Sequence, residues 1–245
     1  MALPLDIIVA GPSESRMVAA ALAPRLQCRM HINKDTQCTN HPTWKTERNA
    51  TFLEECRQAM PLQAGNCANQ TRLVWAWQSY ANIDPRLEQF VNATRGKRRH
   101  VLFYNVGAHY FVQFPEFKAS MFYQDTVGRP QEWLNQYYID MTRLIPWLQH
   151  WRDTYGCVLW KTIPIFQPRQ GDVNQSLHPS SAHGVHAMMN KWTIAMAAAA
   201  DIPVLDIQSH TIWESTVKSL DDFYHGWDFG WQADELLNAI EARGC

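Results

Sequence analysis

The chain lacks an excess of charge of either sign, because its 22 Lys and Arg residues balance 23 Asp and Glu residues and leave a net charge of −1. Proteins whose main partner is a nucleic acid normally carry a strongly basic face. The one basic run, at residues 97–100, is interpreted as a solvated lead-in to a strand. Nucleic acid is therefore not expected as a partner.

Long hydrophobic runs are also absent. The longest apolar stretch, residues 192–200, is too short to cross a bilayer. The start of the chain has no basic segment and runs straight into an apolar strand pattern, unlike a signal peptide. We expect any signal or membrane anchor to lie upstream of this chain.

Three ligand-binding signatures are missing. The first strand is followed by neither G-x-G-x-x-G nor a P-loop, which disfavours nucleotide binding. No Cys-x-x-Cys occurs, and the cysteine spacings match no common zinc pattern. His178, His183 and His186 have no carboxylate or cysteine near them in sequence, so a loop and a helix start are expected there. The sequence predicts no metal site and no cofactor.

The chain does contain six cysteines, Cys28, Cys38, Cys56, Cys67, Cys157 and Cys245. The first four crowd into a polar stretch without clear periodicity, at about residues 24–70. This pattern predicts an insertion stapled by disulfides, with metal binding as the competing interpretation. The sequence does not choose among the pairings.

Four Asn-x-Ser/Thr sequons, at Asn49, Asn69, Asn92 and Asn174, are more than this composition should yield by chance. Such sequons accept N-linked glycans in secreted proteins. Together with the cysteines they predict a secretory-pathway or extracellular location.

Apolar runs of strand length alternate with helical patterns along the chain. Strands are expected at residues 5–10, 72–78, 101–106, 157–165 and 204–207, and helices at 17–22, 131–155 and 184–200. This alternation predicts an α/β fold with a three-layer, doubly wound parallel sheet. At 245 residues, one domain over residues 1–245 is expected, interrupted by the cysteine-rich insertion.

Ser13 falls on the turn between the first strand and the first helix. Unpaired backbone N–H groups and the positive end of the helix dipole surround a serine in that position. Both favour the negative oxygen that develops in acyl transfer. The alternative is that Ser13 is only a helix N-cap.

Asp222 and His225, near the other end of the chain, are three residues apart and could face the same side of one turn. Asp222 could then orient the imidazole while its other nitrogen takes the serine proton. The alternative is a solvated polar loop. In a doubly wound sheet, the loops after the first and third strands meet at one edge, which would gather Ser13, Asn105, Gly107 and His109 there.

These motifs resemble the SGNH hydrolase superfamily, and within it the PC-esterase and trichome-birefringence-like branch that handles O-acetyl groups on glycans. Gly11, Ser13 and Arg16 match the family's opening Gly-Asp-Ser-x-x-Arg, and Asp222 with His225 matches its closing Asp-x-x-His. Residues 105–110 are similar to its Asn-x-Gly-x-His/Trp block, and residues 160–164 and 204–206 to its later strands. The similarity covers nearly the whole chain, least at residues 24–70, and implies a flavodoxin-like sheet.

Three positions depart from the family pattern. Pro12 stands in place of the aspartate beside the nucleophile, and His109 stands where broader SGNH enzymes have an oxyanion-hole asparagine. Gly226 follows His225 where the family often has proline.

The resemblance implies a double displacement in which Ser13 is the nucleophile, His225 the base and Asp222 its orienting partner. The oxyanion and substrate-binding candidates are Gly107, Asn105, His109 and Arg16, with Trp227 as a platform for a sugar ring. The expected substrate is an acylated glycan or a small ester, and the expected activity is that of a serine esterase. A glycan O-acetyltransferase with the same triad and a catalytically silent glycan-binding protein are the alternatives. The oligomeric state is left open.

Overall fold

The computed structural model describes residues 3–30, 62–78, 81, 83–107, 130–164, 179–211 and 229–245. Several predicted residues lie outside the described residues: Cys38, Asn49, Cys56, His109, Asn174, His178, Asp222, His225 and Trp227.

The described part of the chain forms a six-stranded sheet in the order β2-β3-β1-β4-β5-β6. The strands are β1 (Leu5–Gly11), β2 (Gln63–Asn66), β3 (Arg72–Trp77), β4 (Arg99–Tyr104), β5 (Gly156–Lys161) and β6 (Val204–Leu205). Strands β3, β1, β4, β5 and β6 are parallel, as predicted. The edge strand β2, which the sequence did not predict, is antiparallel to β3.

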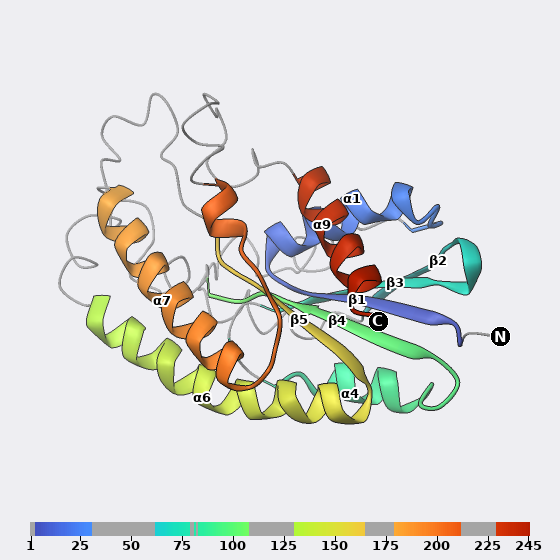
Figure 1. Ribbon diagram of the computed structural model, residues 1–245, viewed down its shortest axis with the longest axis horizontal. Helices are drawn as coiled ribbons and strands as arrows, with labels where there is room; N and C mark the ends of the chain where they lie inside the picture. Colours follow the sequence, from blue (N-terminus) through green and yellow to red (C-terminus); the bar gives the residue numbers. More distant parts are fainter. Residues whose placement is uncertain are drawn as a thin grey trace, which may run out of the picture.

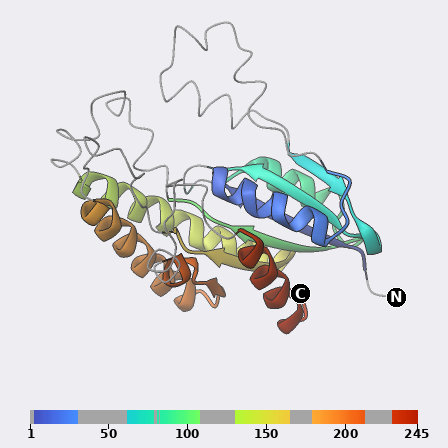
Figure 2. The same ribbon diagram turned by 90° about the horizontal axis from the view of Figure 1, so that it is seen from above.

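Helices cover both faces of this sheet (Figure 1). Helices α1 (Ser13–Arg25) and α9 (Phe229–Ala242) pack on one face. Helices α4 (Pro85–Asn92), α6 (Pro130–Thr154) and α7 (Pro179–Ala199) lie on the other face, with α6 and α7 side by side (Figure 2). The predicted three-layer, doubly wound α/β architecture is confirmed.

The central strands are apolar on both sides because both of their faces are covered. In β1, Ile8 and Ala10 pack in the cluster with α4, α6 and α7, while Ile7 and Val9 pack in the cluster with α1 and α9. Continuous apolar runs are typical of such doubly covered parallel strands. This explains why the sequence marks β1, β3, β4 and β5 so clearly.

The aromatic residues are mainly structural. Trp75, Trp77, Trp147, Trp151 and Trp160 are all buried. Trp151 lies on α6, whose other core positions recur every three or four residues at Tyr137, Met141, Leu144 and Leu148. That spacing puts one apolar stripe of the helix against the sheet. Most of the described tryptophans therefore belong to the core.

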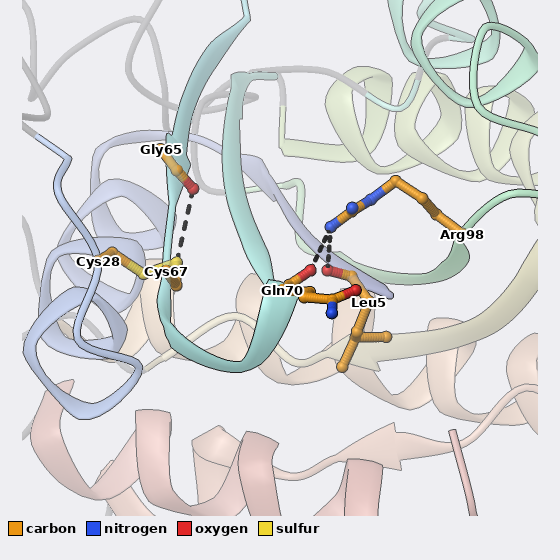
Figure 3. Close-up of a disulfide and its surroundings, with 6 residues drawn as sticks. All are labelled: Leu5, Cys28, Gly65, Cys67, Gln70 and Arg98. Carbon is orange, nitrogen blue, oxygen red and sulfur yellow. Dashed lines mark hydrogen bonds between the residues drawn. A yellow bond between two sulfur atoms is a disulfide. The ribbon is translucent and has the colours of Figure 1, made fainter. Parts of the chain in front are cut away.

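Two disulfides lie toward the amino ends of the strands. Cys28, just after α1, is bonded to Cys67, which precedes the short 3-10 helix η2 (Ala68–Gln70) and strand β3. This bond joins the two ends of the predicted insertion (Figure 3). Cys157 at the start of β5 is bonded to Cys245 at the end of the chain. The prediction of disulfides is confirmed for these four cysteines.

Two arginines surround the buried Asp6 at the same amino ends of the strands. The Asp6 carboxylate accepts hydrogen bonds from Arg72 Nε at 2.9 Å and Nη2 at 2.6 Å, and another from Arg98 Nε. Arg98 Nη2 also donates to the carbonyl oxygens of Leu5 and Gln70 at 3.0 and 2.7 Å (Figure 3). The arginines thus join the starts of β1, β3 and β4.

No helix among the described residues is long and apolar enough to cross a membrane. In the same part of the chain, no group of three His, Cys, Asp or Glu residues is arranged to hold a metal ion.

Candidate active site

The site candidate is the carboxyl edge of the sheet between β1 and β4. From β1 the chain continues through α1 on one face and by way of the edge strand β2 to β3, whereas from β4 it continues through α6 on the other face to β5. The connections of the neighbouring strands β1 and β4 therefore leave in opposite directions. In open α/β sheets this topological switch point is where ligands bind.

Strand β1 ends in a tight turn. Asn105 N donates to Ala10 O at 2.9 Å, and Gln78 N donates to Gly11 O at 3.1 Å, so the end of β1 is held between β4 and β3. A Cβ atom at Gly11 would collide with Ser15 Oγ and with the Asn105 carbonyl oxygen. Only glycine fits this close approach.

Ser13 is the first residue of α1, and Pro12 is its N-cap. Pro12 has φ −73° and ψ −162°, an extended conformation that the proline ring favours, and its carbonyl accepts the first helical bond from Arg16 N at 3.2 Å. The proline that departs from the family pattern thus fits the turn without strain. The capping position is taken by Pro12, so the interpretation of Ser13 as an N-cap was wrong.

The first turn of α1 places Ser13 among helical N–H groups that have no partner within the helix. These groups and the helix dipole favour negative charge at that point. Arg16 lies in the same turn and is partly exposed. The backbone position is therefore suited to a nucleophile whose attack creates an oxyanion.

Asn105, directly after β4, is fully buried. Its Nδ2 donates to Lys161 O at 2.9 Å and to Thr162 O at 3.3 Å, so it joins the ends of β4 and β5. Both amide hydrogens of Asn105 are thereby directed at backbone carbonyls. This geometry suits a residue that positions the edge of the sheet better than one that binds substrate directly.

Gly107 follows two residues later with φ +131°, a conformation that residues with a side chain rarely adopt. A Cβ atom there would collide with Ile163 Cδ1. The loop after β4 therefore packs closely against the segment after β5. This packing brings the backbone of Gly107 to the edge that also carries Ser13.

The segment after β5 is held from α7. Asn190 Oδ1 accepts from Ile163 N, and Asn190 Nδ2 donates to Ile163 O, both at 2.8 Å. Thr162 Oγ1 accepts from Gln208 N at 2.9 Å, which links β5 to helical residues 207–211. Sequence reasoning missed Asn190, although a polar residue on the apolar side of a helical pattern was a usable signal.

Glu14 and Lys161 form a second contact that the sequence analysis missed. Both side chains are 0% exposed, and Lys161 Nζ lies 3.7 Å from Glu14 Oε1. Burial lowers the pKa of Lys161, and the nearby Glu14 carboxylate opposes that shift. No local sequence pattern predicts this contact, because the two residues are far apart in sequence.

The segment that carries Asp222 and His225 runs between described residues 211 and 229. Just outside it, the rings of His210 and Trp231 stack with centroids 3.5 Å apart and planes 7° apart. The two flanks of the segment are therefore held together. His210 follows β6, and Trp231 lies in the first turn of α9.

Comparison with known proteins identifies the fold. No protein-family model matches the chain, and no curated protein matches it. Among solved structures, Axe2, an acetylxylan esterase from Geobacillus stearothermophilus, aligns over 98% of this chain and 96% of its own, at 11% identity and a TM-score of 0.50. A gut microbial diltiazem-metabolizing enzyme aligns over 97% of this chain and 47% of its own, at 6% identity and a TM-score of 0.54.

A member of the lipolytic G-D-S-L family from Veillonella parvula aligns over 97% of both chains, at 13% identity and a TM-score of 0.46. The chain shares its α/β fold with the acetylxylan esterase Axe2. At these identities the likeness concerns the fold alone, and fold does not by itself define function.

Proposed function

We propose that the protein is a serine esterase that hydrolyses O-acetyl esters of a glycan. Ser13 is the nucleophile, His225 the general base and Asp222 the residue that orients His225. The observation that carries the proposal is the backbone position of Ser13, the first residue of α1 directly after the central strand β1, at the switch point beside β4. The acetylxylan esterase with the same fold supports an ester substrate.

In the proposed reaction, Ser13 Oγ attacks the ester carbonyl carbon while His225 takes the hydroxyl proton. The backbone N–H groups of Ser13 and Gly107 stabilise the oxyanion of the tetrahedral intermediate. The bond between the acyl carbon and the sugar oxygen then breaks, and His225 gives the proton to the leaving sugar oxygen. An acetyl group remains on Ser13.

Deacylation repeats these steps with water. His225 takes a proton from the water molecule as it attacks the acetyl carbonyl. The bond between the acetyl carbon and Ser13 Oγ then breaks, His225 returns the proton to Ser13 Oγ, and acetic acid leaves. If a sugar hydroxyl replaces the water, the same residues perform an acetyl transfer. Arg16, His109 and Trp227 are proposed substrate contacts at this edge.

We further propose that the protein works in the secretory pathway or outside the cell. The Cys28–Cys67 and Cys157–Cys245 disulfides are typical of an oxidising compartment. Two of the predicted glycosylation sites, Asn69 and Asn92, are exposed, so a glycan could be attached to either without entering the core.

The test is labelling with a fluorophosphonate probe and hydrolysis of an aryl acetate. We expect the wild-type protein to react and Ser13→Ala to lose both activities, with kcat reduced by about 10⁴-fold or more. Ser15→Ala is the matched control, because it removes a second hydroxyl from the same turn and should leave the labelling intact.

A wild-type protein that the probe does not label would refute the esterase and favour a silent glycan-binding protein. The substrate class is tested with acetylated xylo-oligosaccharides and O-acetylated sialosides, by measuring released acetate. Acetyl transfer to a glycan acceptor without release of acetate would identify a transferase.

A further inference from the structure

The buried pair of Glu14 and Lys161 lies beside the proposed nucleophile. Glu14 is the residue after Ser13, in the first turn of α1, and Lys161 is the last residue of β5. Both side chains are 0% exposed, and Nζ lies 3.7 Å from Oε1. The two charged groups therefore face each other inside the protein, at the carboxyl edge of the sheet.

A buried ion pair of this kind contributes little to the stability of a core. Removing two charges from water costs more than their mutual attraction returns unless further hydrogen bonds complete the geometry, and a well-packed apolar pair is often more stable. Among the described residues, neither carboxylate oxygen of Glu14 has a hydrogen-bond partner, and Nζ of Lys161 has none. The only charged group there that acts on Lys161 is Glu14.

The pair completes a ring of contacts around the turn that holds Ser13. From Glu14 the ring passes to Lys161 across the ion pair, and from the Lys161 carbonyl to Asn105 through the 2.9 Å hydrogen bond. The Asn105 carbonyl in turn abuts Gly11, two residues before Ser13. The backbone from Gly11 to Glu14 is thus held at both ends against β4 and β5.

We propose that Glu14 and Lys161 are positioning residues for the nucleophile. Their contact holds the first turn of α1 next to the carboxyl end of β5 and so orients Ser13 toward the ester carbonyl. The proposal rests on the proposed role of Ser13. Breaking the pair should slow the attack by Ser13 while leaving substrate binding nearly unchanged. A misplacement of about 1 Å at a reacting group can cost about 100-fold in rate.

The experiment compares Glu14→Gln, Lys161→Met and the double variant with the wild type. The measurements are the rate constant of fluorophosphonate labelling per folded molecule, and kcat and KM for an aryl acetate, at a temperature where circular dichroism shows every variant folded. Each single variant should lose about 10- to 100-fold in kcat and in labelling rate, with KM within about twofold of wild type. The double variant breaks the same contact as either single variant, so it should lose about as much as the slower single variant and not the product of the two losses.

Arg72→Met is the matched control, because it breaks an ion pair with the buried Asp6 at the opposite edge of the sheet. It should lower the midpoint of unfolding and leave the labelling rate per folded molecule unchanged. If either single variant does not fold, Glu14→Asp keeps the charge but shortens the reach by one methylene group, and it should lower the labelling rate at least about fivefold.

Variants that are less stable but label at the wild-type rate per folded molecule would overturn the proposal and leave the pair with a structural role only. The same holds if the double variant labels at close to the wild-type rate. A wild-type protein that is not labelled, or one labelled equally well after Ser13→Ala, would instead refute the proposed function.

Discussion

Asn190→Ala should destabilise the protein strongly, because Asn190 forms hydrogen bonds with both backbone groups of Ile163. The side chain is buried, accepts from Ile163 N and donates to Ile163 O, both at 2.8 Å. Alanine cannot replace either bond. A buried backbone group left without a partner costs about 1–3 kcal/mol, so the two together should cost about 2–6 kcal/mol.

This loss is a large part of the total, since domains of this kind are stable by about 5–15 kcal/mol. The assay is urea unfolding followed by tryptophan fluorescence and by far-UV circular dichroism, with the free energy of unfolding extrapolated to zero urea. Lys191→Ala is the matched control on the exposed side of the same helix and should change the free energy by no more than about 0.5 kcal/mol.

An Asn190→Ala variant within about 0.5 kcal/mol of wild type would refute the reasoning. It would mean that the two hydrogen bonds contribute no net stability and that another group holds the end of β5. Asn190→Leu separates packing from hydrogen bonding, because leucine keeps the volume of the side chain but leaves both groups of Ile163 unpaired. It should be destabilised by a similar amount.

Three further predictions concern pH, backbone strain and the disulfide of the insertion. Burial lowers the pKa of His100, with Asp6 opposing the shift, so the unfolded chain takes up the proton first as the pH falls below about 6.5. The free energy of unfolding should therefore be highest above about pH 7 and decline toward pH 5. In urea titrations, His100→Asn should make the free energy of unfolding depend less on pH in this range. Gly107→Ala should cost about 1–3 kcal/mol, because alanine is strained at φ +131°, and a wild-type unfolding midpoint would contradict the strain. Replacing both Cys28 and Cys67 by alanine opens a loop with a sequence separation of 39 and should cost about 4 kcal/mol, while fluorophosphonate labelling per folded molecule should persist, because the bond lies at the opposite edge from Ser13.

The sequence predicted the elements that have a strong local pattern. The apolar runs at β1, β3, β4 and β5 and the periodic helices α6 and α7 were all expected, with ends that differ by a few residues. The predicted strand 157–165 ends earlier, at Lys161, and the helix expected at 17–22 begins earlier, at Ser13. Element ends depend on caps and on tertiary contacts, which periodicity does not report.

Three elements were missed for identifiable reasons. Strand β2 has the sequence Gln-Ala-Gly-Asn, with only Gly65 buried, so it has no apolar pattern. It forms because its backbone pairs with the edge of β3. Helix α4 is short, although Asp84 caps it through Arg86 N at 2.9 Å and Pro85 begins it. That Asp-Pro pair was a usable start signal. Helix α9 has buried apolar positions every three or four residues, at Phe229, Ala233, Leu236 and Ile240, and that period was a usable signal.

The sequence by itself determined the secondary structure of the central sheet and the location of Ser13 at a strand-to-helix turn. Burial on both faces produces a continuous apolar run, and a helix start depends on the residues next to it, so both can be recognised from neighbouring residues. Only the tertiary structure decided the order β2-β3-β1-β4-β5-β6 and the contacts that depend on it. Glu14 meets Lys161, and Asn190 meets Ile163, because β1, β5 and α7 pack at one edge of the sheet. Such contacts arise from the free energy of packing the whole chain, to which no local pattern gives access.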